Sequence, residues 1–365
     1  TDQDVAKIYR DNGYLFFDIN PVELNITGDS VDVEIRVTEG KQATLNNIVI
    51  NGNDLTSEKV VRRQIFTRPG YLFSQSDFER SIREIASLGQ FDPEAIAGEG
   101  GYSIIPNQMN NTVDLVYNVT EKPSSQLELS GGWGANTFVA SVGVSFNNFS
   151  TARMFKGDAW RPVPLGDAQN LSIKLQTNGT YYTSFVFGFT EPWLFGKKPT
   201  SLQIQSYYSR QTDSYLAIGV LSNNRVMQVY GFTAGIGNRL KWPDNYFTLY
   251  NGLSWQVYDL KNWIDGYFMF NDGRSHNLCY NVSLSRTSTD QMIYPRKGSV
   301  FSASLQLTPP YSLFRKKDLG TLDDSGNPVR VANYKDINYD NWTSQQRYKW
   351  IEYHKWKVSA ETYTR

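Results

Sequence analysis

The sequence lacks most of the residues and motifs on which enzymes and metal sites depend. It contains one cysteine, Cys279, and two histidines, His276 and His354. An internal disulfide, a cysteine zinc cluster and an H-E-x-x-H zinc site are therefore excluded. Neither a G-x-x-x-x-G-K-[ST] nor a G-x-S-x-G motif occurs, which removes the common nucleotide and hydrolase signatures. We expect no enzymatic activity, no catalytic residues, no metal and no cofactor.

The sequence also lacks an excess of charge and a long apolar run. Lys and Arg together number 36, as do Asp and Glu, so nothing favours nucleic acid as a partner. Mean hydropathy is −0.47, and no run of about 18 apolar residues exists, which excludes a transmembrane helix. The low mean hydropathy does not exclude a transmembrane β-barrel, because the strands of such a barrel alternate apolar and polar residues and are hydrophilic on average.

Aromatic residues are scarce in the first third and abundant afterwards. All nine tryptophans lie from Trp133 to Trp356, and 18 of the 23 tyrosines follow Pro123. Amphipathic rings gather where one end meets an apolar phase and the other meets water, as at membrane interfaces. The first third therefore has the composition of a soluble α+β protein, and the aromatic content of the rest indicates a different class of protein.

The soluble third contains a repeat. Val31–Glu39 aligns with Val113–Glu121, with five of nine residues identical, and both alternate as half-buried strands do. The second copy closes a complete β-α-α-β-β unit, whereas the first 39 residues hold only a short helix and two strands. In the complete unit we expect strands at Ala43–Ile50, Tyr102–Pro106 and Thr112–Glu121, a helix from Thr56 as its cap to Gln64, and a helix from Ser76 with a Ser76/Glu79 capping box.

This order resembles the POTRA domain. The resemblance rests on the Gly13-Tyr14 and Gly89-Gln90-Phe91 steps and on the closing V-D-x-x-x-x-V-T-E strand. Two POTRA-like units directly before an aromatic-rich β region resemble the BamA family of outer-membrane assembly factors. A pair of unrelated α+β modules is the alternative.

Ten segments after the repeat alternate with period 2, and each is close to the roughly 9–11 residues that a tilted strand needs to cross a bilayer. A soluble β-sandwich would show the same alternation. The connections favour a barrel, because compact ones bearing Pro and aromatics alternate with polar ones; Phe149–Asp167 is a misfit, since a short turn is expected there. Trp193, Trp242 and Tyr294 would form part of a periplasmic aromatic belt. The ten segments are Gln126–Trp133, Phe138–Asn147, Leu171–Gln176, Tyr181–Glu191, Ser201–Asp213, Met227–Asn238, Phe247–Tyr258, His276–Ser285, Ser299–Thr308 and Tyr348–Tyr363.

The resemblance implies α+β POTRA domains followed by an antiparallel transmembrane β-barrel, with about ten of the family's sixteen strands present. The implied domains are 1–40, the C-terminal part of a POTRA domain; 41–122, a complete POTRA domain; and 123–365, the N-terminal barrel strands. The family's Val-Arg-Gly-aromatic motif is absent, as expected if the chain stops at Arg365 before it. The implied function is folding and inserting β-barrel proteins into the bacterial outer membrane, with the POTRA domains in the periplasm. A two-partner secretion exporter or a TamA-like translocation factor is the alternative.

Function would then reside at a strand edge. A strand entering a bilayer with unpaired backbone groups is penalised by several kcal/mol per group, and pairing with an exposed edge removes that penalty. We expect the first barrel strand to be this edge, because it is short and rich in glycine. The alternative is that its glycines only bend the strand. The predicted seam consists of Gln126, Leu127, Glu128, Leu129, Ser130, Gly131, Gly132 and Trp133.

The implied partners are nascent outer-membrane β-barrel proteins, outer-membrane lipids and accessory BAM lipoproteins, with no nucleic acid. Arg62 and Arg63, on the first helix of the complete POTRA unit, lie where family members bind partners. A solvated helix face is the alternative for both.

Overall fold

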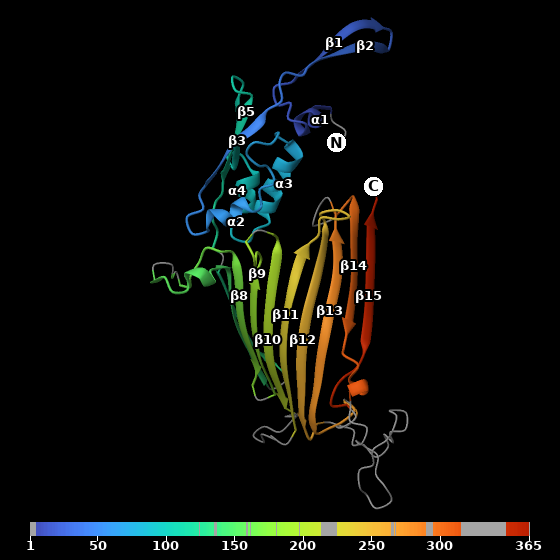
Figure 1. The fold of residues 1–365 in the computed structure, drawn as a ribbon. Helices are drawn as coiled ribbons and strands as arrows, with labels where there is room; N and C mark the ends of the chain where they lie inside the picture. The colour runs from blue at the N-terminus through green and yellow to red at the C-terminus, as the bar shows by residue number, and fades with distance from the viewer. Residues whose placement is uncertain are drawn as a thin grey trace, which may run out of the picture. The chain divides into compact units, whose positions relative to one another are not determined.

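The computed structural model describes residues 5–364 except for 124, 135–136, 158–159, 161, 180, 197, 213–224, 264–265, 267, 290–294 and 315–347. The chain divides into two compact units (Figure 1). Unit 1 comprises Thr1–Ser125 with Asn147–Ala168, and unit 2 comprises Gln126–Phe146 with Gln169–Arg365. Among the described residues, no helix has the length and apolar character to span a membrane.

Unit 1 contains a two-stranded hairpin and a three-stranded sheet with helices. The sheet has the order β3-β5-β4, in which β3 and β5 are parallel and β4 is antiparallel to β5. The elements are α1 (Val5–Asp11), β1 (Asp18–Thr27), β2 (Ser30–Thr38), β3 (Thr44–Asn51), α2 (Glu58–Arg62), α3 (Gln75–Ala86), α4 (Pro93–Ala97), β4 (Tyr102–Asn107) and β5 (Thr112–Asn118).

The core of unit 1 lies between the sheet and helix α3. Alternate residues of β5, Val113, Leu115 and Tyr117, are fully buried, which is the pattern of a strand with one covered face. Helix α3 carries Phe78, Ile82 and Ile85 at the expected i, i+4, i+7 spacing, and all three join the same buried cluster. The β-α-α-β-β order is confirmed, with the five-residue helix α4 as an addition that the sequence analysis did not predict.

Both predicted helix caps in unit 1 are wrong by one or two residues. Thr56 is buried and its N–H donates to Glu121 Oε1 at 2.6 Å, so Ser57 stands at the N-cap of α2, which ends at Arg62. Helix α3 is capped by Ser74, whose side chain accepts from the Asp77 N–H. Residues distant in the sequence form hydrogen bonds with Thr56 and Ser76, which the local sequence pattern predicts as caps.

Ser76, the predicted cap of α3, bonds a distant residue instead. Its N–H and hydroxyl donate to the two carboxylate oxygens of Asp11 at 2.6 and 2.7 Å. Asp11 closes helix α1, so these bonds attach α1 to the first turn of α3.

Unit 2 is one antiparallel sheet of ten strands, which lie side by side in sequence order (Figure 1). All ten predicted strands are present, most of them longer than predicted, and Tyr294 falls outside the described residues. The strands are β6 (Ser125–Gly134), β7 (Thr137–Phe149), β8 (Gln169–Asn178), β9 (Tyr182–Glu191), β10 (Thr200–Thr212), β11 (Val226–Arg239), β12 (Phe247–Lys261), β13 (Gly273–Thr287), β14 (Gly298–Leu307) and β15 (His354–Tyr363).

The last strand starts later than predicted. Strand β15 begins at His354 rather than Tyr348. The residues before it pair elsewhere, because the Ile351 N–H donates to the His276 carbonyl at 2.9 Å and Trp350 forms a parallel bridge with His276. They therefore extend the ladder of β13 beyond the end of β14.

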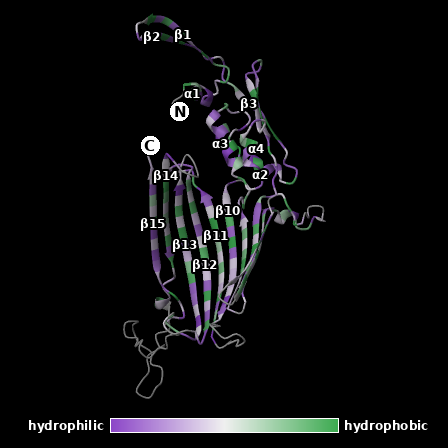
Figure 2. Cartoon of the chain, turned by 180° about the vertical axis from the view of Figure 1, so that it is seen from behind, coloured by the Kyte–Doolittle hydropathy of each residue, from purple (hydrophilic) through white to green (hydrophobic). Residues whose placement is uncertain are grey.

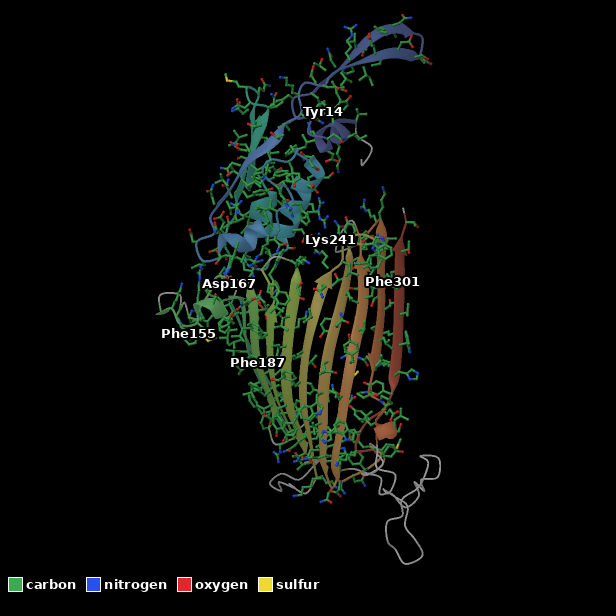
Figure 3. The ribbon with its side chains drawn as sticks, viewed as in Figure 1. Tyr14, Phe155, Asp167, Phe187, Lys241 and Phe301 are labelled. Atoms are coloured by element: carbon green, nitrogen blue, oxygen red, sulfur yellow. The ribbon has the colours of Figure 1, made fainter. Side chains whose placement is uncertain are left out.

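The sheet has one apolar and one polar face. One cross-strand row of β11, β12 and β13 consists of Phe232, Trp255 and Leu278. The adjacent row, whose side chains point to the other face, consists of Gly231, Gln256 and Asn277. This alternation appears as banding by hydropathy along the strands in Figure 2, and Phe187 and Phe301 in Figure 3 belong to the apolar face. In a transmembrane barrel the apolar face meets lipid and the polar face lines the interior.

On the polar face, tyrosine rings lie over glycines of neighbouring strands. A Cβ at Gly231 would lie 2.0 Å from the Tyr207 ring, and one at Gly235 would lie 2.1 Å from the Tyr250 hydroxyl. Only glycine leaves room for these rings, so the glycines are packing sites rather than weak points of the sheet. Cys279 is buried on the same face.

Candidate functional site

Strand β6, the predicted seam, forms one edge of the ten-stranded sheet. Among the described strands only β7 lies beside it, and β15 forms the opposite edge. The backbone groups on its other side thus have no strand partner within the described sheet. Leu127, Leu129 and Trp133 are exposed by 65%, 68% and 77%. Within the described sheet, β6 therefore combines an edge position with an apolar surface.

Polar contacts bind β6 to the rest of the sheet on the opposite face. Glu128 Oε2 lies 3.5 Å from Lys174 Nζ on β8, two strands away. The pair crosses β7 at Gly143, where a Cβ would lie 3.4 Å from Glu128 Oε2. Ser130 and Ser141 share a hydrogen bond of 2.6 Å. These contacts attach β6 to its neighbours without occupying its outer edge.

Gly131 and Gly132 do not interrupt the strand, which continues to Gly134. Neither has a positive φ, so the backbone conformation does not require glycine. A Cβ at Gly132 would meet nothing within 4 Å, and one at Gly131 would only touch the Phe138 ring at 3.7 Å. The two glycines withhold side-chain packing from this end of β6, which weakens a strand.

Arg62 and Arg63 lie at the end of α2. The Arg62 side chain is exposed and forms an ion pair with Glu58 one turn earlier, and its guanidinium also donates to the Ile48 carbonyl at 3.3 Å. Arg63 is the C-cap residue of the helix and is half-buried. Arg62 is thus the more accessible of the two.

The described residues of the long connection between β7 and β8 belong to unit 1. Asn148 Nδ2 donates to the buried Thr56 Oγ1 at 2.9 Å, and the Ser57 N–H donates to the Gly166 carbonyl at 2.9 Å. Arg153 Nη2 donates to Ser57 Oγ at 3.0 Å. These bonds hold both ends of the connection against the N-terminus of α2.

Asp167 is the charged centre of this contact (Figure 3). Its side chain is 9% exposed and lies 2.6 Å from Lys59 Nζ, and the Ser150 hydroxyl donates to it at 2.5 Å. Burial alone would raise the pKa of Asp167, but the hydrogen bonds from Lys59 and Ser150 and the charges of Lys59 and Arg153 outweigh it, so the pKa lies below its ordinary value. This network was not predicted from the sequence, in which only the excess length of Phe149–Asp167 marked the connection as unusual.

A groove in unit 1 runs beside the free edge of β4. It has a volume of about 610 Å³ and is lined by residues of α3, β4 and the segment after α1, with Phe16, Phe78 and Tyr102 among them. In the order β3-β5-β4, strand β4 is an edge strand. An aromatic groove beside such an edge suits an extended peptide that adds to the sheet.

Two of the three predicted belt aromatics lie in connections at one end of the barrel sheet. Trp193 follows β9 and is half-buried, and its N–H donates to Glu191 at 2.8 Å. Trp242 precedes β12 and is exposed. Because consecutive strands are antiparallel, both connections lie at the end where β6 begins.

Comparisons with known proteins agree with this architecture. The Omp85 superfamily domain matches residues 164–362, more than half of the chain. The chain belongs to the Omp85 superfamily. A POTRA family model, described as a surface antigen variable number repeat, matches residues 43–122. These matches make it an outer-membrane β-barrel protein whose POTRA unit lies in the periplasm.

BamA proteins are among the relatives within the superfamily. BamA of Neisseria meningitidis is 27% identical over 322 residues, which cover 82% of this chain and 36% of that protein. BamA from Haemophilus ducreyi lacking POTRA domains 1–3 shares the fold, with a TM-score of 0.56 and 19% identity over 84% of this chain and 56% of that one. CdiB from Escherichia coli has a TM-score of 0.50 and 15% identity over 97% and 56% of the two chains. The chain thus spans about a third of the length of the Neisseria protein.

Proposed function

We propose that this chain is the POTRA-to-barrel part of an outer-membrane protein assembly factor, which folds β-barrel proteins and inserts them into the outer membrane. The observation that carries the proposal is the position of β6 at one edge of the described ten-stranded sheet. The curated relative in Neisseria meningitidis is named as such a factor. The proposed domains are 1–40, 41–122 and 123–365.

The proposed mechanism is strand templating and needs no chemical step. An incoming strand pairs its N–H and C=O groups with the outer edge of β6, so it crosses the bilayer without unpaired backbone groups. The exposed Leu127, Leu129 and Trp133 keep this edge apolar. Glu128 and Ser130 keep β6 attached to β7 and β8 while the outer edge is in use.

Site-specific photocrosslinking in cells tests the templating edge. The full-length protein would carry a photoreactive phenylalanine derivative at Leu129 or, as the matched control, at Leu253. Both are leucines of the sheet, exposed by 68% and 51%, but Leu253 lies on β12, which has a partner on each side. We expect a β-barrel substrate arrested during assembly to crosslink at Leu129 and not at Leu253. Equal crosslinking at the two sites, or none at Leu129, would contradict templating at β6.

The second candidate is a transporter of the same superfamily, either a two-partner secretion exporter or a TamA-like translocation factor. The likeness to CdiB from Escherichia coli concerns the fold, which both candidates share. Depletion of the protein separates them. An assembly factor is required for many outer-membrane barrels at once, whereas an exporter is required for its own secreted substrate.

The POTRA unit is proposed to receive substrate and to dock accessory lipoproteins. The groove beside β4 would take an extended substrate segment. Arg62 and Arg63 would contact acidic residues of an accessory protein. Reversing both charges, with Arg83 on α3 reversed as the control, should reduce co-purification of the accessory proteins. Unchanged co-purification would remove the two arginines from the docking site.

A further inference from the structure

The connection between β7 and β8 carries an exposed apolar tip, formed by Met154, Phe155 and Trp160. Phe155 is 97% exposed, and Met154 and Trp160 are exposed as well. The indole N–H of Trp160 donates to the Met154 carbonyl at 3.1 Å, so these two residues are held together; Phe155 is labelled in Figure 3. Exposed clusters of large apolar residues on a protein surface mark interaction sites.

The base of the same connection is held in place. Asn148, Arg153 and Asp167 bind the N-terminal end of α2 through the hydrogen bonds and ion pair described above. The tip is therefore presented by an anchored base. Phe155 and its neighbours Met154 and Lys156 are exposed, whereas Arg153, which binds Ser57, is half-buried.

The strand order places the tip near one surface of the membrane. Strand β6 begins directly after the POTRA unit, and β6 and β7 are antiparallel neighbours, so the β7–β8 connection lies at the end of the sheet where β6 begins. This is the periplasmic end. Phe155 follows the last residue of β7, Phe149, by six positions, which limits its distance from the strand end to about 20 Å.

The composition of the tip fits a lipid surface. Aromatic rings with a polar atom, flanked by basic residues, gather in the headgroup layer. Lys156, next to Phe155, is exposed and positively charged. Other connections at the same end of the sheet also expose aromatic rings, Phe195 and Trp242 among them. The tip thus shares its exposed aromatic composition with other connections at the periplasmic ends of the strands.

We propose that Met154, Phe155 and Trp160 insert into the phospholipid headgroup layer of the periplasmic leaflet, with Lys156 on the lipid phosphates. The connection would then bind the membrane at its tip and helix α2 at its base. This contact does not depend on strand templating, because an exporter barrel would make it equally. Failure of one proposal leaves the other standing.

The test measures the depth of the tip in a membrane of known composition. The full-length protein, with Cys279→Ser and Phe155→Cys, is labelled with an environment-sensitive NBD fluorophore and placed in nanodiscs of phosphatidylethanolamine and phosphatidylglycerol. The matched control is Met109→Cys, which is 94% exposed on the β4–β5 turn of the POTRA unit. We expect blue-shifted emission from the fluorophore at position 155. A spin label near the lipid headgroup should quench most of the intensity of that emission. Emission at position 109 should be unshifted and unquenched.

Two outcomes would overturn the proposal. Emission at position 155 that matches position 109 would show that the tip stays in water. A blue shift that appears only after accessory proteins are added would assign the tip to a protein partner. Folding is checked by the heat-dependent mobility of the barrel on gels. Met154→Cys provides a second labelling site with the same expected result if Phe155→Cys folds poorly.

Discussion

Replacing Asp167 by Asn should release the β7–β8 connection from unit 1 without unfolding the POTRA core. Asp167 holds Lys59 at 2.6 Å and accepts from the Ser150 hydroxyl at 2.5 Å. Asparagine has nearly the same shape but no charge, so the substitution removes the ion pair and leaves the packing intact. The backbone bond from the Ser57 N–H to the Gly166 carbonyl then depends on the remaining contacts.

The magnitude follows from the exposure of the two partners. The Lys59 side chain is 53% exposed and that of Asp167 is 9% exposed, so the pair contributes about 1 kcal/mol or less, as surface pairs do. A hydrogen bond to a charged acceptor contributes about 1.5–3 kcal/mol, of which a neutral amide retains about 1. We therefore expect Asp167→Asn to lower the free energy of opening the connection by about 1–3 kcal/mol.

Hydrogen exchange monitored by mass spectrometry reports this opening locally. In full-length protein in nanodiscs, peptides covering 53–60 and 147–168 should exchange about 5–150 times faster in the variant, since each 1.4 kcal/mol corresponds to a factor of about ten. Peptides from α3 and β5 should not change. The control is Glu58→Gln, which removes an exposed partner of Arg62 on the same helix and should change exchange less than threefold.

The same carboxylate predicts the pH dependence. Because the pKa of Asp167 is lowered in the folded protein, its stabilising contribution is present above the unfolded pKa of about 4 and is lost as the pH falls through the lower folded value. Protection of 147–168 should therefore decrease on acidification in the natural protein and show no such step with Asp167→Asn. Equal protection of variant and natural protein at neutral pH would refute the account of this network.

Three further predictions concern the barrel and the POTRA core. Glu128→Lys should weaken the attachment of β6 by about 0.2–1 kcal/mol, because the pair is half-exposed, and adding Lys174→Glu should restore it in a double-mutant cycle of β6 exchange. Gly235→Val should lower the thermal unfolding temperature of the barrel, because its Cβ would meet the Tyr250 hydroxyl, and Tyr250→Ala should recover part of the loss. Burial raises the pKa of Tyr117 to about 12. The contribution of its neutral hydroxyl to the free energy of unfolding is therefore complete below about pH 10 and is lost as the pH rises through about 12. Tyr117→Phe should remove this alkaline destabilisation of about 3 kcal/mol, measured by chemical unfolding at a series of pH values.

The strands of the barrel could be predicted from the sequence because two different environments select them residue by residue. Trp255 faces the apolar side and Gln256 the polar side of one strand, and a shift of one residue would exchange them. The order of strands along the chain then identifies β6 as an edge. The start of β15 could not be predicted in this way, because Tyr348–Tyr353 alternates as a strand would, but Lys349–Ile351 pairs with His276 of β13.

The helix caps show the limit of local patterns. Thr56, Ser57, Ser74 and Ser76 are all capable caps, and the sequence alone offers no means of ranking them. At the first helix, Glu121 determines which residue is the N-cap, because it binds the Thr56 N–H from 65 positions away. At the second helix, Asp11 has the same effect by binding the Ser76 N–H, again from 65 positions away. Contacts of that separation leave no periodic signal in the sequence.

The β7–β8 connection limits how Arg62 and Arg63 can serve as a docking site. Ser57 and Lys59, at the start of α2, already bind Arg153 and Asp167 of the same chain, so an accessory protein that approached the first turn would have to displace these partly buried bonds. Arg62 faces a smaller barrier, because its partner Glu58 is exposed and such pairs contribute little. An incoming carboxylate could therefore replace Glu58 on Arg62 at a cost below about 1 kcal/mol. Docking of an accessory protein on α2 should depend on Arg62 and be unaffected by Lys59→Met.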